Sequence, residues 1–133
     1  MSVLAVTSRE RGDRVVLEAA GRADEHGGDL HVLYVLDLGW FARLELGLAE
    51  RVGIPVGRGV IEGVCARIAD GAARDLVDEY EAVGRVGDPV TEAVTYADRI
   101  GARCVVVDGT SAPWSDRSVL EAGVHGIPVV PVY

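Results

Sequence analysis

The 133-residue chain carries 13 basic and 21 acidic residues, which gives a net charge of −8. This length suits one domain, residues 1–133, and 49% hydrophobic with 26% charged residues is a globular composition. The acidic balance repels phosphate backbones and anionic lipid, so we expect neither nucleic acid nor a membrane surface as a partner. No apolar run reaches the length of a membrane span, and residues 1–4 lack a basic secretory start, so we expect a cytoplasmic protein.

Lysine is absent, and all 13 basic residues are arginine. With the acidic excess, this halophilic composition resembles that of proteins adapted to high salt, where carboxylates keep the surface hydrated and salt screens their repulsion. GC-rich coding, which favours arginine, alanine, glycine and valine, explains the same composition. The sequence leaves both explanations open.

The first part of the chain predicts two strands around a helix. Residues 3–6 are a short apolar run, typical of a buried strand. Asp13 can cap a helix that runs to about His26, and the Gly27-Gly28 pair can end it in a left-handed conformation. Residues 30–36 are almost continuously apolar, which predicts a strand buried on both faces, as in a parallel sheet.

Residues 37–59 give weaker signals, and a helix follows them. Four apolar residues suggest a short amphipathic helix, namely Trp40, Phe41, Leu44 and Leu48. Residues 53–59 form a glycine-rich link, and a long helix is predicted from about Val60 to Tyr80.

The last part of the chain predicts three more strands. Residues 82–86 give a weak strand, and Asp88 and Pro89 are an N-cap and first residue for a helix that ends near Gly101. Residues 104–107 predict a fourth strand. Ser115 or Ser118 can cap a short last helix before a fifth strand over 129–133. Pro131 places that strand at a sheet edge or a bulge.

Alternating strands and helices predict an α/β fold, with a five-stranded, mostly parallel sheet and helices on both faces. Ligands of such sheets lie beyond the carboxyl ends of the strands. The segments of interest are therefore 7–13, 37–39, 87–89 and 108–118. In the last of these, Thr110 and Ser111 supply hydroxyl donors, and Gly109 permits either a close approach to a ligand or a tight strand exit.

Catalytic and metal-binding patterns are missing from the sequence. There is no GxSxG motif, no HExxH motif and no P-loop lysine. The histidines His26, His31 and His125 are far apart, and Cys65 and Cys104 form no CxxC pair. We therefore expect no catalytic residue, no metal and two structural thiols.

The run from Gly57 to Gly63 reads GxGxxxG at the start of the predicted long helix. It approximates a dinucleotide-binding fingerprint, but its spacing differs by one residue and the strand before it would be very short. We interpret it as a connection between elements.

Four segments of the chain follow one another in a specific order and spacing. They are a helix–turn–strand stretch over 26–35, Gly87-Asp88-Pro89 before a helix, a strand with a Gly-Thr exit over 105–110, and a final strand over 127–132. Together they resemble the universal stress protein family over nearly the whole chain. The resemblance implies a Rossmann-like fold and a homodimer through the C-terminal strand.

The phosphate-binding residues of that family are only partly matched. ATP-binding members carry an aspartate at the end of the first strand, where Thr7 stands here. Of their glycine-rich loop, Gly109 matches the first glycine, Ala112 replaces the second, and Ser115-Asp116 replaces a later Gly-Ser after a shortened interval. We therefore expect no resident cofactor and weak or no binding of ATP or AMP. If a nucleotide binds, the resemblance places it at Thr7, Ser8, Val35, Gly109, Thr110 and Ser115.

Three functions compete on this basis. The leading hypothesis is a non-enzymatic stress-response domain that acts by association as a homodimer. Binding of another protein partner is a further option. The alternative is an adenine-nucleotide sensor that uses the loops after the first and fourth strands. The third is a slow nucleotide hydrolase, which lacks a general base, a metal site and any cationic phosphate clamp other than arginine.

Overall fold

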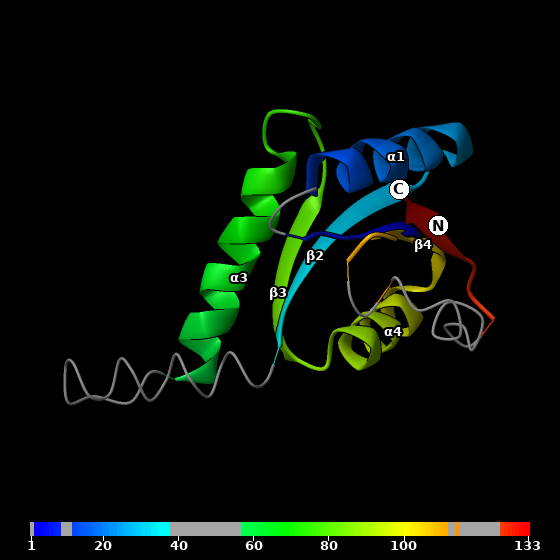
Figure 1. Cartoon of the computed structure of the whole chain (residues 1–133). Helices are drawn as coiled ribbons and strands as arrows, with labels where there is room; N and C mark the ends of the chain where they lie inside the picture. The colour runs from blue at the N-terminus through cyan, green and yellow to red at the C-terminus, as the bar shows by residue number, and fades with distance from the viewer. Residues whose placement is uncertain (1, 9–11, 38–56, 112–113, 115–125) are drawn as a thin grey trace.

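The computed structural model describes residues 2–8, 12–37, 57–111, 114 and 126–133 (Figure 1). Five strands and three helices alternate in this part of the chain. In chain order they are β1 (Ser2–Val6), α1 (Gly12–His26), β2 (Asp29–Asp37), α3 (Arg58–Ala73), β3 (Glu81–Gly87), α4 (Pro89–Ile100), β4 (Ala102–Asp108) and β5 (Val129–Val132). None of these helices is long and apolar enough to cross a membrane.

The strands form one parallel sheet in the order β3-β2-β1-β4-β5. Val6 at the end of β1 pairs with Leu33 of β2 on one side and Val107 of β4 on the other. The α/β prediction is confirmed, and the sheet is parallel throughout. β5 forms an edge, as Pro131 indicated, because a residue without an N–H fits poorly inside a sheet.

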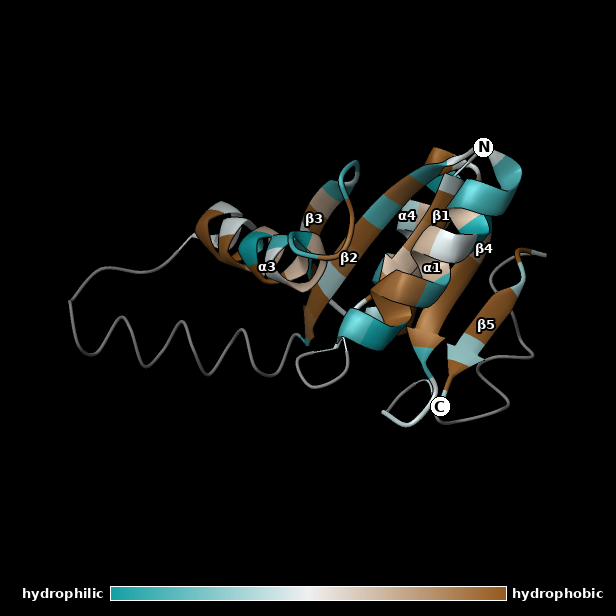
Figure 2. Cartoon of the chain, turned by 90° about the horizontal axis from the view of Figure 1, so that it is seen from above, coloured by the Kyte–Doolittle hydropathy of each residue, from teal (hydrophilic) through white to brown (hydrophobic). Residues whose placement is uncertain are grey.

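Helices cover both faces of the sheet, and Figure 1 shows α1 and α4 on opposite sides of it. Alternate residues of β1 enter two separate apolar layers. Val3 and Ala5 join the first core cluster, which includes buried residues of α1 and α3, whereas Leu4 and Val6 join the second, which includes buried residues of α4. Figure 2 shows the apolar character of the strands between these helices.

The helix ends reflect local capping. Gly27 ends α1 with φ of +62°, and Gly101 ends α4 with φ of +63°, as expected for left-handed caps. Asp88 caps α4, because its carboxylate accepts a hydrogen bond from the Thr91 backbone N–H at 2.9 Å. Asp13 does not precede its helix: α1 begins at Gly12, and Asp13 lies in the first turn, where its negative charge is favourable.

The long helix predicted to Tyr80 ends earlier, at Ala73. The chain then turns back, and the Tyr80 hydroxyl donates a hydrogen bond to the Asp70 carboxylate. This bond lowers the pKa of Asp70 and raises the pKa of Tyr80. Val77 and Tyr80 pack against the first core cluster from this turn. Their spacing in the sequence is helix-like, but they lie in a loop.

Several predictions concern residues outside the described ranges. These are the amphipathic helix with Trp40, Phe41, Leu44 and Leu48, and the last helix with its cap at Ser115 or Ser118. Trp114 is described, and it is buried in the second core cluster.

Cys65 and Cys104 form no disulfide and are buried in the first core cluster, which confirms them as core thiols. Burial raises the pKa of the Cys104 thiol.

We expect the native protein at pH 8 to react slowly with a thiol reagent, and both thiols to become reactive when the protein is unfolded in urea. Because the folded state keeps its proton to a higher pH, Cys104 should also reduce stability as the pH rises above about 8.5. Fast labelling of both thiols in the native protein would contradict this expectation.

Gly84 sets the distance between β3 and α3. A Cβ atom at this position would overlap the Glu62 carbonyl oxygen and the Ala66 backbone nitrogen, and would lie 2.6 Å from the Cβ of Cys65. Two of these atoms belong to the backbone of α3, so they cannot move aside without moving the helix.

We expect Gly84→Ala to reduce the free energy of unfolding by about 3 kcal/mol or more, because the helix must move off the sheet. Urea unfolding measures the change. The matched control is Gly63→Ala on α3, where a Cβ meets nothing within 4 Å. That variant should be neutral or stabilising by up to about 1 kcal/mol, since alanine favours helix. Equal stability of Gly84→Ala and wild type would contradict the close contact.

Candidate functional site

The carboxyl ends of β1 and β4 lie side by side near the centre of the sheet. The pairing of Val6 with Val107 places Thr7 and Ser8 next to Asp108 and the residues that follow it. The structure thus brings together four residues of the predicted nucleotide site, Thr7, Ser8, Gly109 and Thr110. The carboxyl ends of central parallel strands are the usual ligand position in this fold class.

Thr7 extends the pairing of β1 with β2. Its backbone N–H donates to the Leu33 carbonyl oxygen at 2.8 Å, and its hydroxyl donates to the same oxygen at 3.2 Å. Thr7 is only 6% exposed. The Thr7 hydroxyl is therefore engaged by the backbone of β2.

Asp108 is the centre of the polar cluster at this edge. It is only 3% exposed. Its Oδ1 accepts hydrogen bonds from the Thr110 backbone N–H at 3.0 Å and the Thr110 hydroxyl at 2.6 Å, and its Oδ2 accepts one from the Ser8 hydroxyl at 3.1 Å. The Ser111 hydroxyl donates to the Asp108 backbone carbonyl at 3.2 Å. One carboxylate therefore joins the loops after β1 and β4.

Gly109 lies under the end of β5. Its N–H donates to the Val132 carbonyl oxygen at 2.9 Å. A Cβ at this position would lie 2.8 Å from both the Cβ of Pro131 and a ring carbon of Tyr133. The space next to Gly109 is thus filled by the chain itself, which is the tight strand exit that the sequence allowed.

The remaining predicted residues lie elsewhere or are not described. Val35 is half-buried in β2 and packs against the second core cluster. Ser115 lies outside the described residues. At the end of β3, Gly87 has φ of +153° and Asp88 is occupied as the cap of α4.

Sequence reasoning gave Asp108 no role, although it included the residue in a segment of interest. The available signal was local: an aspartate directly before Gly-Thr-Ser can accept hydrogen bonds from the backbone and hydroxyl two residues on. Its partnership with Ser8 could not be read from the sequence, because those residues are 100 positions apart.

The glycine-rich run at the start of α3 differs from a phosphate cradle. Gly57 is the N-cap of α3, with an extended backbone and no side-chain capping bond. Cβ atoms at Gly57, Gly59 and Gly63 would meet nothing within 4 Å in the described part of the chain. No close contact with the described part of the chain explains these glycines.

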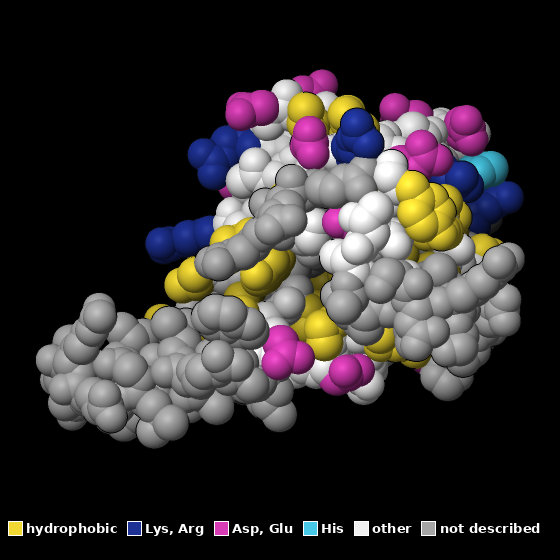
Figure 3. All heavy atoms as spheres, viewed as in Figure 1, with side chains coloured by type: hydrophobic (Ala, Val, Ile, Leu, Met, Phe, Trp, Pro, Cys, Tyr) yellow, Lys and Arg dark blue, Asp and Glu magenta, His cyan; other side chains and the backbone are white. Residues whose placement is uncertain are grey.

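The described part of the face in Figure 3 carries no continuous patch of basic side chains. Acidic and arginine side chains lie interspersed over its described part. Arg85 pairs with Glu62 at 3.7 Å and lies over the Tyr96 ring, and Arg74 pairs with Asp70 at 3.1 Å. These arginines already face acidic or aromatic partners.

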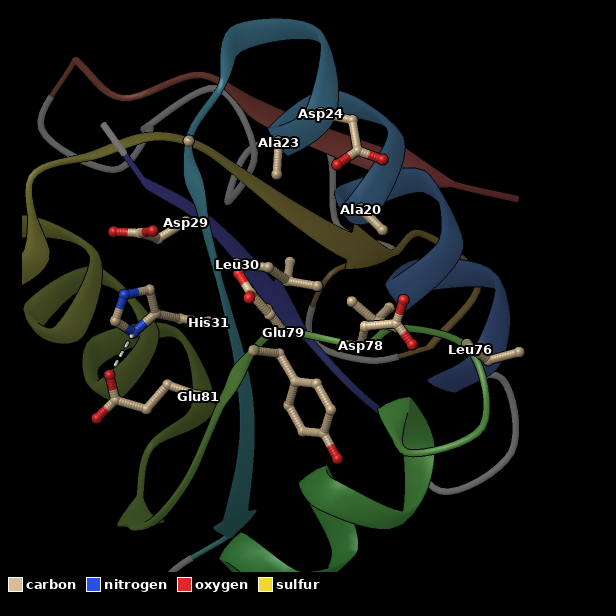
Figure 4. Close-up of a pocket in the computed structure, with 13 residues that line it drawn as sticks. Ala20, Ala23, Asp24, Asp29, Leu30, His31, Leu76, Asp78, Glu79 and Glu81 are labelled. Carbon is tan, nitrogen blue, oxygen red and sulfur yellow. Dashed lines mark ion pairs between the residues drawn. The ribbon is translucent and has the colours of Figure 1, made fainter.

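A cavity of about 630 Å³ lies at the opposite, amino-terminal ends of β2 and β3 (Figure 4). Its lining includes five carboxylates and neither arginine nor lysine; the five are Asp24, Asp29, Asp78, Glu79 and Glu81. Such a lining repels phosphate. The described residues contain no group of three or more histidine, cysteine, aspartate or glutamate side chains placed to hold a metal ion.

His31 lies between this cavity and α4. Its Nδ1 is 2.7 Å from the Tyr96 hydroxyl and 3.6 Å from a Glu81 carboxylate oxygen. Burial and the nearby Glu81 raise the pKa of Tyr96, whereas Arg85 and Arg99 act in the opposite direction. The position of His31 in a strand is confirmed, and its ring is held by neighbours from β3 and α4.

No protein-family model and no curated protein matches the chain. Solved structures do match over almost its whole length. A universal stress protein in complex with cAMP is 17% identical, with a TM-score of 0.67 over 100% of this chain and 97% of that chain. The universal stress protein from Archaeoglobus fulgidus in complex with dAMP is 20% identical, with a TM-score of 0.62 over 99% of this chain and 95% of that one.

A protein from the universal stress protein family of Burkholderia pseudomallei is also similar. It is 20% identical, with a TM-score of 0.58 over 98% of this chain and 94% of that one. The chain has the universal stress protein fold. The resemblance read from the four sequence segments is therefore confirmed at the level of the fold.

Proposed function

We propose that this universal-stress-protein-like domain is a cytoplasmic, non-enzymatic stress-response protein that acts by association as a homodimer, with weak or no binding of ATP. The observation that carries the proposal is the apolar edge strand β5. Its four residues are all half-buried, and Tyr133 beyond it is 70% exposed. The two buried cysteines, which form no disulfide, are compatible with a reducing compartment.

β5 offers a surface suited to a second copy of the chain. β4 pairs with one side of it, and the other side is the edge of the sheet that the described strands form. An apolar edge with unpaired backbone groups favours pairing with another chain. In a two-fold contact, Val130 and Val132 of one copy would lie near their own mates. Pro131 lacks an N–H, so side-chain burial would contribute more than a continuous hydrogen-bond ladder.

The proposal of weak nucleotide binding rests on how the polar groups are used. The fold neighbours include complexes with cAMP and dAMP, which keeps an adenine-nucleotide sensor as the alternative function. In this chain the Thr7 hydroxyl bonds to the sheet, and Ser8 and Thr110 donate to Asp108. Donors engaged within the protein are poorly placed to hold a phosphate.

We expect light scattering of the wild-type protein at micromolar concentration to give about 28 kDa, twice the 14.0 kDa chain mass. Val130 and Val132 also pack against the first core cluster, so Val130→Asp or Val132→Asp should release a less stable monomer, because the dimer would bury the unpaired charge more completely. Val60→Asp, on the exposed face of α3, is the matched control and should stay dimeric. Circular dichroism distinguishes a folded monomer from an unfolded chain. A monomeric wild type, or Asp variants that stay fully dimeric, would exclude β5 as the interface.

We expect ATP with magnesium to bind with a dissociation constant above about 0.1 mM. The reasons are the engaged donors at the carboxyl edge and, in the sequence, the shortened loop with Asp116. Titration calorimetry on natively purified protein measures the affinity. Micromolar binding, or ATP retained through purification, would favour the nucleotide-sensor alternative.

A further inference from the structure

The Asp108 carboxylate takes up hydrogen-bond donors that a bound anion at this edge would also need. Thr110 contributes a backbone N–H and a hydroxyl to Oδ1, and Ser8 contributes a hydroxyl to Oδ2. These donors come from two loops at the carboxyl edge, and a group with two acceptor oxygens joins them. A phosphate oxygen would seek donors of the same kind from the same loops.

The donors cannot serve Asp108 and a phosphate at full strength together. The Thr110 backbone N–H and each hydroxyl carry one hydrogen. A phosphate placed against them would also meet the negative charge of Asp108 in a site that is 3% exposed, where solvent screens charge poorly. Competition for the donors and repulsion by the carboxylate both weaken the binding of phosphate-bearing ligands.

We propose that Asp108 is a resident anion that determines the charge specificity of the carboxyl edge: it holds the donors of Ser8 and Thr110 and so excludes phosphate-bearing ligands. This inference rests on the weak nucleotide binding in the proposed function and is independent of the dimer. Weak nucleotide binding is thereby assigned to the Asp108 side chain, whereas the sequence alone indicated the shortened loop and Asp116 as its cause.

Asp108→Asn tests the assignment, because asparagine keeps the shape and one acceptor oxygen but removes the charge. AMP is titrated into wild type and variant at low ionic strength, with adenosine as a probe that lacks the phosphate. We expect AMP to bind the variant about tenfold or more tightly than wild type, which is the loss of one close like-charge interaction. Adenosine should bind both proteins equally.

Asp37→Asn is the matched control for net charge. Asp37 ends β2 at the same edge of the sheet and is exposed. Since solvent screens an exposed charge, this variant should change AMP affinity by less than about threefold. An equal gain in both variants would overturn the proposal in favour of a general charge effect.

Amide NMR locates the binding. In Asp108→Asn, AMP should shift the Thr110 amide resonance, whereas the Thr7 amide, bonded to Leu33, should move little. If the asparagine variant does not fold, Asp108→Ser provides a second uncharged variant, and wild type alone can still overturn the proposal. Micromolar AMP binding to wild type that shifts the Thr110 amide overturns the inference and the weak-binding proposal together. Weak AMP binding to wild type and to the folded uncharged variant overturns this inference only.

Discussion

The burial of the central strands on both faces is the constraint on which the rest of this molecule depends. All five residues of β1 are buried, as are six of the seven residues of β4. Helices must therefore cover both faces of the sheet, and Arg103, near the start of β4, is the one exposed residue in these two strands. Among the described residues, the polar cluster at the carboxyl ends of the central strands is formed by Asp108, the last residue of β4, and by residues that directly follow β1 and β4.

The residues at those two strand ends emerge from the core into a crowded position, so their polar atoms need partners within the protein. Thr7 finds one in the Leu33 carbonyl, and Ser8, Asp108 and Thr110 find one another. Gly109 is held between these groups and β5, with Pro131 and Tyr133 against its Cα. The carboxyl edge is thus closed by contacts that follow from the depth of burial.

Most of the fold could be predicted because its signals are local. Apolar runs identified the strands, and Asp88, Gly27 and Gly101 identified helix ends through capping geometry that each residue type favours. The end of α3 could not be predicted in this way. Val77 and Tyr80 continue the apolar spacing of the helix, but they reach the core from a returning loop, which the Tyr80–Asp70 hydrogen bond holds. Periodicity records burial and does not distinguish these two routes to it.

The site was harder to predict than the fold because its decisive contact is long-range. The sequence identified the segments around Ser8 and Thr110 as candidate ligand donors. It could not show that Asp108 would use both, since the Ser8–Asp108 bond depends on the pairing of β1 with β4. A donor inventory taken from sequence counts groups, and only the fold shows which of them are already engaged.

The role proposed for Asp108 would separate the fold, which this chain shares with the cAMP and dAMP complexes, from the ligand contacts at the strand ends. The shared fold is specified by apolar residues within the strands, so it persists at 17–20% identity to the cAMP and dAMP complexes. The charge at the strand ends is specified by very few residues. A carboxylate there joins two loops that are distant in sequence, and the hydrogen bonds that join them are those a phosphate would require. Stability of the carboxyl edge and affinity for an anion therefore draw on the same donors, and in this chain those donors are committed to Asp108.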